Sequence, residues 1–149
     1  MAIQQKISVL NGPNLNMLGT REPDIYGHET LDDIEKKCRD IATARNLKMN
    51  WFQSNSESAL IDKIQSIVET VDWIIINAAG LTHTSVALRD ALALFPGGVI
   101  EVHLSNIHKR EAFRHHSMIS PVATGVIAGF GAASYYMAID AITHLHTET

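Results

Sequence analysis

The chain has only one cysteine, Cys38, among its 149 residues, so no disulfide can form within it. It also contains no apolar run long enough to cross a bilayer, so we expect no membrane partner. The opening residues, MAIQQKISVL, show no basic segment followed by a long apolar stretch, which predicts a strand there and not a signal peptide. Together these absences favour a protein of the reducing cytoplasm.

Positive charge is also scarce. The 12 lysine and arginine residues are outnumbered by 16 aspartate and glutamate residues, giving a formal net charge of -4, and a broad nucleic-acid surface is therefore not expected. Hydrophobic residues make up 46% of the chain, which is typical of a globular protein and not of a disordered one. No repeat or linker divides the sequence, so residues 1–149 are predicted to form a single catalytic domain with a sizeable core.

Motifs for the common cofactors are missing as well. The eight histidines do not fall at zinc-ligand spacings. The glycines Gly125, Gly129 and Gly131 do not spell G-x-G-x-x-G, and they follow the last predicted strand instead of the first. There is no P-loop and no G-x-S-x-G turn. We therefore expect no metal and no cofactor, which leaves acid–base chemistry by side chains.

The sequence does contain a regular alternation of short apolar runs and amphipathic segments. The first helix is predicted to begin at an N-cap, Thr30, with Asp33 three residues later. Two more helices are predicted over residues 60–68 and 85–95, and a last one runs from the turn at 129–131 through 142. The strands are predicted near residues 6–10, 47–52, 71–76, 99–102 and 124–128. This order predicts an α/β domain, a flavodoxin-like three-layer sandwich with a five-stranded parallel sheet. Cys38 falls on an apolar helix stripe and is expected to be buried.

Polar side chains follow the ends of three predicted strands. A single loop of this kind would be ordinary turn chemistry. Because the carboxyl ends of parallel strands meet at one edge of the sheet, several such loops predict a polar ligand site there. The residues concerned are Asn14, Arg21 and Tyr26 after the first strand, Asn77 and His83 after the third, and His103, Ser105, Arg110 and Arg114 after the fourth.

Two local patterns suggest how such a site would work. Glu101 and His103 lie two apart on a predicted strand and so point to the same face. A carboxylate beside an imidazole fixes its tautomer and favours its charged form, as a general acid requires, although a satisfied ion pair at a strand end is the alternative. The segment between Gly19 and Gly27 has glycine hinges and is interpreted as a lid, with an ordinary mobile loop as the alternative.

Longer stretches of the chain resemble the type II 3-dehydroquinate dehydratases. They are NGPNLNMLGTREPDIYG, NAAGLTHTSVALRDAL, and IEVHLSNIHKREAFRHHS followed by ATGVIAGFG, and they cover nearly the whole chain in the right order. The resemblance implies the cofactor-free dehydration of 3-dehydroquinate to 3-dehydroshikimate through an enolate, by a dodecamer built as four trimers. The same reaction serves aromatic amino acid biosynthesis through the shikimate pathway and the catabolism of quinate.

The resemblance also implies a role for individual residues. Tyr26 matches the catalytic base and Arg21 the lid arginine that activates it. His103 matches the general acid and Glu101 its partner. Asn14 matches a residue that holds a water near the enolate oxygen. Substrate binding is implied for Asn77, His83, Asp90, Leu104, Ser105, Arg110 and Arg114, with Asp90 reaching across from a neighbouring subunit.

Three alternatives remain beside this reading. A flavin or nucleotide carrier of the same fold would need a phosphate-cradling loop after the first strand, and Asn-Gly-Pro-Asn does not look like one. A signalling domain of the receiver type would carry an acidic cluster at strand ends that are here rich in amides and histidines. The Schiff-base route to the same product would need a lysine, and the only loop candidate, Lys109, is flanked by charges that favour its ammonium form.

Overall fold

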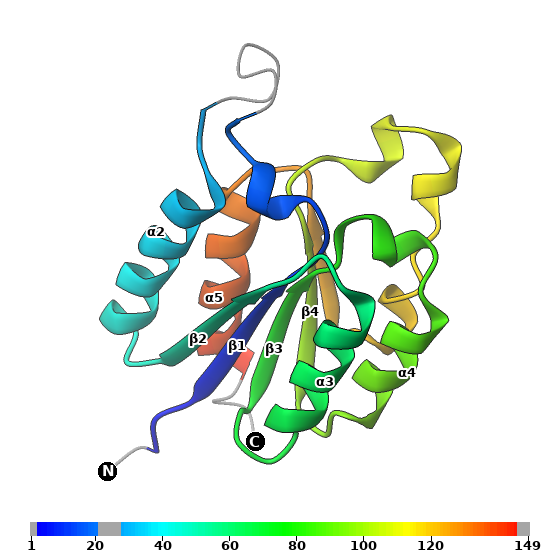
Figure 1. Ribbon diagram of the computed structural model, residues 1–149. Coiled ribbons are helices and arrows are strands. Elements are labelled where there is room, and N and C mark those ends of the chain that lie inside the picture. The colour runs from blue at the N-terminus through cyan, green and yellow to red at the C-terminus, as the bar shows by residue number, and fades with distance from the viewer. Residues whose placement is uncertain (1–2, 21–27, 146–149) are drawn as a thin grey trace.

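The computed structural model describes residues 3–20 and 28–145 of the chain (Figure 1). In this part of the chain one sheet is built from β1 (Lys6–Asn11), β2 (Lys48–Gln53), β3 (Trp73–Asn77), β4 (Gly98–His103) and β5 (Gly125–Ala128). The strand order is β2-β1-β3-β4-β5, and every neighbouring pair is parallel. The predicted five-stranded parallel sheet is therefore confirmed.

Four α-helices of the described residues form the two outer layers. They are α2 (Leu31–Ala44), α3 (Glu57–Ile67), α4 (Val86–Leu94) and α5 (Ala133–Leu145). Figure 1 shows α2 and α5 on one face of the sheet and α3 and α4 on the other. The flavodoxin-like three-layer sandwich is thus the observed fold.

The two hydrophobic cores follow from the alternation of side chains along buried strands. Val9 of β1 and Ile75 of β3 are partners in register and pack beneath α2 and α5. The next residues along, Leu10 and Ile76, are also partners and pack beneath α3 and α4. Because both faces are covered, the central strands are mostly apolar, and most of their polar side chains lie at their carboxyl ends. Cys38 is fully buried in the first core, as expected, and burial raises the pKa of its thiol to about 12.

The structure confirms two predicted helix N-termini, each with its capping hydrogen bonds. The Thr30 hydroxyl accepts a hydrogen bond from the Asp33 backbone N–H, and the Asp33 carboxylate accepts one from the Thr30 backbone N–H, which completes a capping box. At α4 the Ser85 hydroxyl accepts from the Leu88 backbone N–H at 2.9 Å.

The connections at the carboxyl edge of the sheet contain short 3₁₀ helices that the sequence did not predict. They are η1 (Leu15–Met17), η2 (Ala79–His83), η3 (Ile107–Lys109), η4 (Ala112–His115) and η5 (Ser120–Val122). These turns bring the loops after β1, β3 and β4 together above the sheet. In residues 3–20 and 28–145, no helix combines the length and the apolar character needed to span a membrane.

Candidate active site

The site begins where three strands end side by side. Asn11 and Asn77 are the last residues of β1 and β3 and are partners in register, and His103 is the last residue of β4. The loops after β1 and β3 meet closely, because the Gly12 N–H donates to the Asn77 carbonyl at 2.8 Å. A Cβ at Gly12 would lie only 2.4 Å from the Ala78 carbonyl oxygen, so this contact requires glycine.

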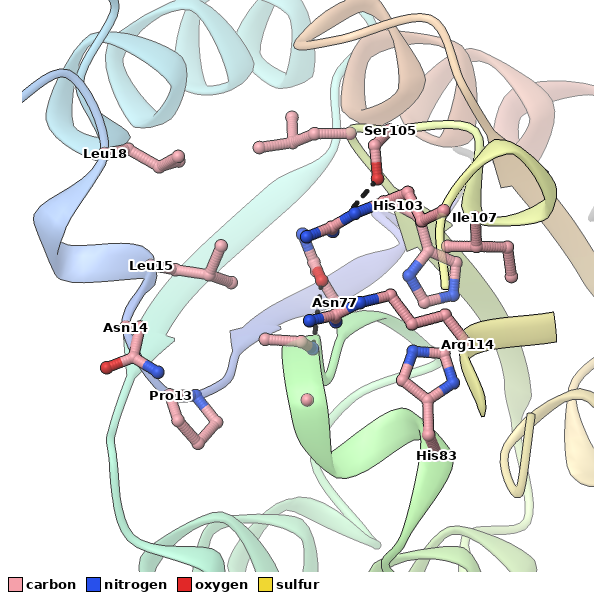
Figure 2. Close-up of a pocket in the computed structure, with 14 residues that line it drawn as sticks. Pro13, Asn14, Leu15, Leu18, Asn77, His83, His103, Ser105, Ile107 and Arg114 are labelled. Carbon is pink, nitrogen blue, oxygen red and sulfur yellow. Dashed lines mark hydrogen bonds between the residues drawn. The ribbon is translucent and has the colours of Figure 1, made fainter. Parts of the chain in front are cut away.

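A pocket of about 350 Å³ opens at this edge. Figure 2 shows that Pro13, Leu15 and Leu18 lie on one side of it, while His83, His103 and Arg114 lie across from them. The volume suits a small organic ligand. The lining residues are Pro13, Asn14, Leu15, Leu18, Asn77, Ala79, Gly80, His83, His103, Leu104, Ser105, Ile107, Arg110 and Arg114.

Most of the predicted site residues come together here. Those that line the pocket are Asn14, Asn77, His83, His103, Leu104, Ser105, Arg110 and Arg114. Glu101 lies next to His103 without lining the pocket. Asp90 is exposed on α4, apart from the pocket of its own chain, and its implied contact across a subunit boundary stays a prediction. Arg21 and Tyr26 lie outside the described residues.

The Glu101–His103 pair predicted from strand alternation is formed. The Nε2 atom of His103 lies 2.5 Å from Oε2 of Glu101. Both residues are buried, with 5% of His103 and 1% of Glu101 exposed, so water screens the pair little. An ionised carboxylate only accepts hydrogen bonds, so Nε2 carries the hydrogen of this bond. The nitrogen left for a ligand is Nδ1.

Two serines complete the surroundings of the Glu101 carboxylate. The Ser117 hydroxyl donates to Oε2 at 2.9 Å, and the Ser120 hydroxyl donates to Oε1 at 2.5 Å. Burial alone would raise the pKa of Glu101, but hydrogen bonds from His103, Ser120 and Ser117 outweigh it and hold the pKa below its ordinary value. Glu101 is therefore a carboxylate at neutral pH, as a partner of a histidine acid must be.

His83 is oriented by the loop that follows β4. Its Nδ1 lies 2.9 Å from the His116 carbonyl oxygen. A carbonyl only accepts, so Nδ1 carries a hydrogen and Nε2 is the nitrogen available to a ligand. The rings of His83 and His103 are stacked with centroids 6.4 Å apart. The pocket thus has two imidazoles, each held at one nitrogen by an acceptor.

The charge of the lining is positive. Arg110 and Arg114 contribute guanidinium groups, and the described lining residues include no aspartate or glutamate. Arg110 donates to the Ser105 hydroxyl at 3.4 Å, while Arg114 is held by a 3.0 Å bond to Glu111 outside the lining. A small anion with hydroxyl groups fits this combination of arginines, imidazoles and amides.

Lysine chemistry has no candidate in this lining. None of the described lining residues is lysine, and Lys109 is exposed in η3. No three histidine, cysteine, aspartate or glutamate side chains in the described part of the chain group so as to hold a metal ion.

The sequence did not reveal three polar residues that organise the site from behind. Ser117 and Ser120 reach Glu101 from the irregular segment before β5. Tyr135 of α5 donates to Asn11 from 124 positions along the chain. Serines in a loop and a tyrosine in an apolar helix carry no periodic signal. The apolar wall of Leu15 and Leu18 was also missed, although their spacing of three residues is typical of a helical turn.

Comparison with known proteins identifies the family of the chain. The chain matches the family model described as "Dehydroquinase class II" over residues 5–143. A 3-dehydroquinate dehydratase from Psychromonas ingrahamii is 56% identical over 139 residues, which is 93% of each chain. One from Cereibacter sphaeroides is 52% identical over 139 residues, covering 93% of this chain and 95% of that protein.

Solved structures give the same result. The crystal structure of a type II dehydroquinase from Butyrivibrio crossotus superposes with a TM-score of 0.90 at 45% identity, covering 93% of this chain and 97% of that one. The chain therefore belongs to the class II dehydroquinase family and is an enzyme of the type II 3-dehydroquinate dehydratase class.

Proposed function

We propose that the chain converts 3-dehydroquinate to 3-dehydroshikimate through an enolate, with Tyr26 as the base and His103 as the acid. The observation that carries this proposal is the pocket at the carboxyl edge of the sheet. It combines a buried histidine–carboxylate pair with two arginines, and the described residues of its lining include no acidic group. The names of the relatives, 3-dehydroquinate dehydratases, point to the same reaction.

The chemistry sets three requirements. The carbon next to the ketone loses a proton because its charge moves to oxygen as an enolate. Hydroxide then leaves from the adjacent carbon, and it leaves far more easily when it is protonated to water. The site therefore needs a base, a group that stabilises the enolate oxygen and an acid.

His103 supplies the acid in this proposal. Glu101 holds its Nε2, so the proton for the leaving hydroxide comes from Nδ1. The departing water carries that proton away. After product release, Tyr26 gives the proton that it took from carbon to solvent and His103 takes one up, which restores both the phenolate and the imidazolium. Glu101 stays ionised throughout, since its pKa is held low by hydrogen bonds from His103 and the two serines that outweigh the effect of burial.

Tyr26 supplies the base, and Arg21 favours its phenolate. A phenol has an ordinary pKa near 10, so ionising it at pH 7 requires about 4 kcal/mol at roughly 1.36 kcal/mol per unit. A neighbouring guanidinium in a site closed to water is a sufficient source for much of this stabilisation. Asn14, a lining residue, holds the water that donates to the enolate oxygen.

The remaining lining residues bind the substrate. Asn77, His83 and Arg114 hold the ring hydroxyls, and the backbone N–H groups at Leu104 and Ser105 together with the Ser105 hydroxyl hold the carboxylate. Arg110, which bonds to Ser105, adds positive charge beside that carboxylate. Asp90 contributes from a neighbouring subunit in a dodecamer of four trimers. The enzyme acts in the cytoplasm, without a cofactor.

The deciding experiment is an ultraviolet assay for the conjugated enone that dehydration creates. Purified protein is mixed with 3-dehydroquinate, and His103→Ala prepared in parallel controls for contaminating activity. We expect absorbance to rise with the wild type and to stay nearly flat with the variant. A wild type that gives no enone contradicts the proposed reaction.

Light scattering on the same preparation tests the proposed dodecamer, and an active monomer contradicts that part of the proposal.

A further inference from the structure

A continuous chain of hydrogen bonds, buried at its centre, runs from β2 to the pocket. The Asn11 Nδ2 donates to the Phe52 carbonyl at 3.2 Å, and the Tyr135 hydroxyl donates to Asn11 Oδ1 at 2.7 Å. Asn77 Nδ2 then donates to the Tyr135 oxygen at 3.0 Å, and the Ala79 backbone N–H donates to Asn77 Oδ1 at 3.1 Å. Asn11 and Tyr135 are fully buried and Asn77 is 3% exposed.

The direction of every bond in this chain follows from its two ends. A backbone carbonyl only accepts, so the Asn11 amide presents Nδ2 to Phe52 and Oδ1 to Tyr135. The Tyr135 hydroxyl has one hydrogen, which it gives to Asn11, so it only accepts from Asn77. The Asn77 amide then presents Nδ2 to Tyr135 and Oδ1 to Ala79, whose N–H only donates. The Phe52 carbonyl at one end and the Ala79 N–H at the other therefore require the same orientation of the two amides and the hydroxyl between them.

The tyrosine suits this task because it stays neutral. Burial raises the pKa of the Tyr135 phenol well above its ordinary value, although the bond from Asn77 partly opposes that rise. The hydroxyl therefore keeps its hydrogen across the range in which an enzyme works. A phenylalanine would fill the same space but would provide neither the donor to Asn11 nor the acceptor for Asn77.

We infer that Tyr135 is a positioning residue that fixes which way round the Asn77 amide faces the pocket. The inference rests on the proposed role of Asn77 in binding a substrate hydroxyl. With Tyr135 in place, Asn77 keeps one N–H and one oxygen lone pair for a ligand at fixed positions. Without the phenolic oxygen, the amide is held only through Ala79 and is free to turn away from that orientation.

The matched control is the next residue along α5. The Tyr136 hydroxyl is buried and has no hydrogen-bond partner among the described residues. Tyr136→Phe removes the same atom from the same helix as Tyr135→Phe, and it breaks no hydrogen bond to a described residue. We expect Tyr136→Phe to leave kcat/KM for 3-dehydroquinate within about twofold of the wild type. We expect Tyr135→Phe to lower it by roughly 3–10-fold, which corresponds to one neutral hydrogen bond.

A double-mutant cycle separates positioning from a general structural role. Tyr135→Phe is made in the wild type and in Asn77→Ala, and kcat and KM are measured for all four proteins. If Tyr135 acts through Asn77, its removal changes kcat/KM by less than about twofold once Asn77 is gone. An equal loss in both backgrounds refutes the inference, and so does an unchanged kcat/KM for Tyr135→Phe alone.

A second variant keeps the test open if Tyr135→Phe fails to fold. Asn11→Ala removes the acceptor of the Tyr135 hydroxyl, which then turns to donate to Asn77 and favours the opposite amide orientation. Asn11 does not line the pocket, so a loss of kcat/KM that vanishes in Asn77→Ala supports the relay, and an additive loss refutes it. A wild type inactive toward 3-dehydroquinate overturns the proposed function and this inference together, whereas an active wild type with additive variants overturns the inference alone.

Discussion

Removing the Ser120 hydroxyl is predicted to change both the stability of the protein and its pH–rate profile. In the described structure this hydroxyl is the donor to Oε1 of Glu101, at 2.5 Å, and Glu101 is 1% exposed. A hydrogen bond to a charged group contributes about 1.5–3 kcal/mol. At about 1.36 kcal/mol per unit, Ser120→Ala is expected to raise the pKa of Glu101 by about 1–2 units.

The sign of the pH dependence follows from the direction of the shift. The folded protein holds the pKa of Glu101 below its ordinary value, so the ionised carboxylate stabilises the fold above that ordinary pKa. This stabilisation is lost as the pH falls through the folded pKa. The melting temperature of Ser120→Ala is therefore expected to be lower by roughly 3–12 °C at neutral pH, and the difference narrows in acid.

The activity assay tests whether this stabilisation matters for catalysis. The Tyr26 phenol sets one acid limb of the kcat profile. If Glu101 must be ionised to hold His103, protonation of Glu101 sets a second limb at lower pH, and this limb moves up by about 1–2 pH units in Ser120→Ala. Ser120→Thr keeps a hydroxyl and is expected to restore the limb. Ser134→Ala removes a buried hydroxyl whose one hydrogen bond among the described residues is from the Phe130 N–H, so it lowers stability without moving the limb. A Ser120→Ala pH–rate profile that superimposes on the wild-type profile would contradict the claim that Glu101 must be ionised for catalysis.

Three further predictions concern the proposed mechanism. His103→Ala is expected to lower kcat by about 10²–10⁴-fold with a much smaller change in substrate affinity, and near-full activity would reassign the acid to His83. Tyr26→Phe should abolish turnover under saturating substrate while ligand binding persists. The turnover of Arg21→Ala should be slow at neutral pH and should recover partly as the pH rises. Substantial turnover by Tyr26→Phe contradicts a phenolate base. Borohydride with substrate should not inactivate the enzyme, because no lysine is among the described lining residues; a substrate-sized adduct on Lys109 by mass spectrometry contradicts this.

The sequence predicts those parts of the fold that rest on local, periodic signals. The capping box of Thr30 and Asp33 is visible as two residues at fixed spacing, and the Glu101–His103 pair follows from the two-residue period of a strand. The shared edge of the strand ends follows from right-handed crossovers. Each of these predictions depends on residues close in sequence or on a general rule of topology.

The parts that were missed depend on contacts between distant residues. Ser117 and Ser120 lie 16 and 19 positions from the carboxylate they bind, in a segment of single-turn 3₁₀ helices without a repeating pattern. Tyr135 sits in an apolar helix, where a tyrosine is indistinguishable from packing until its neighbours are known. Polar residues that support a site from outside its lining cannot be predicted from sequence patterns, because their positions depend on the folded geometry and not on a regular spacing.

The place of Tyr135 also affects when the enzyme becomes complete during its synthesis. Asn11 is made 124 positions before Tyr135, which donates to it, and Asn77 is made 58 positions before this tyrosine. Until α5 docks, both amides lack their shared partner, and the face of the sheet that carries Ile7, Val9 and Ile75 is covered by α2 without α5. Chains are made from the N-terminus onward, so the pocket acquires its polar support in one of the last folding steps. A chain that ends before α5 would contain every described residue of the pocket lining, but its Asn77 amide would be held through the Ala79 N–H alone.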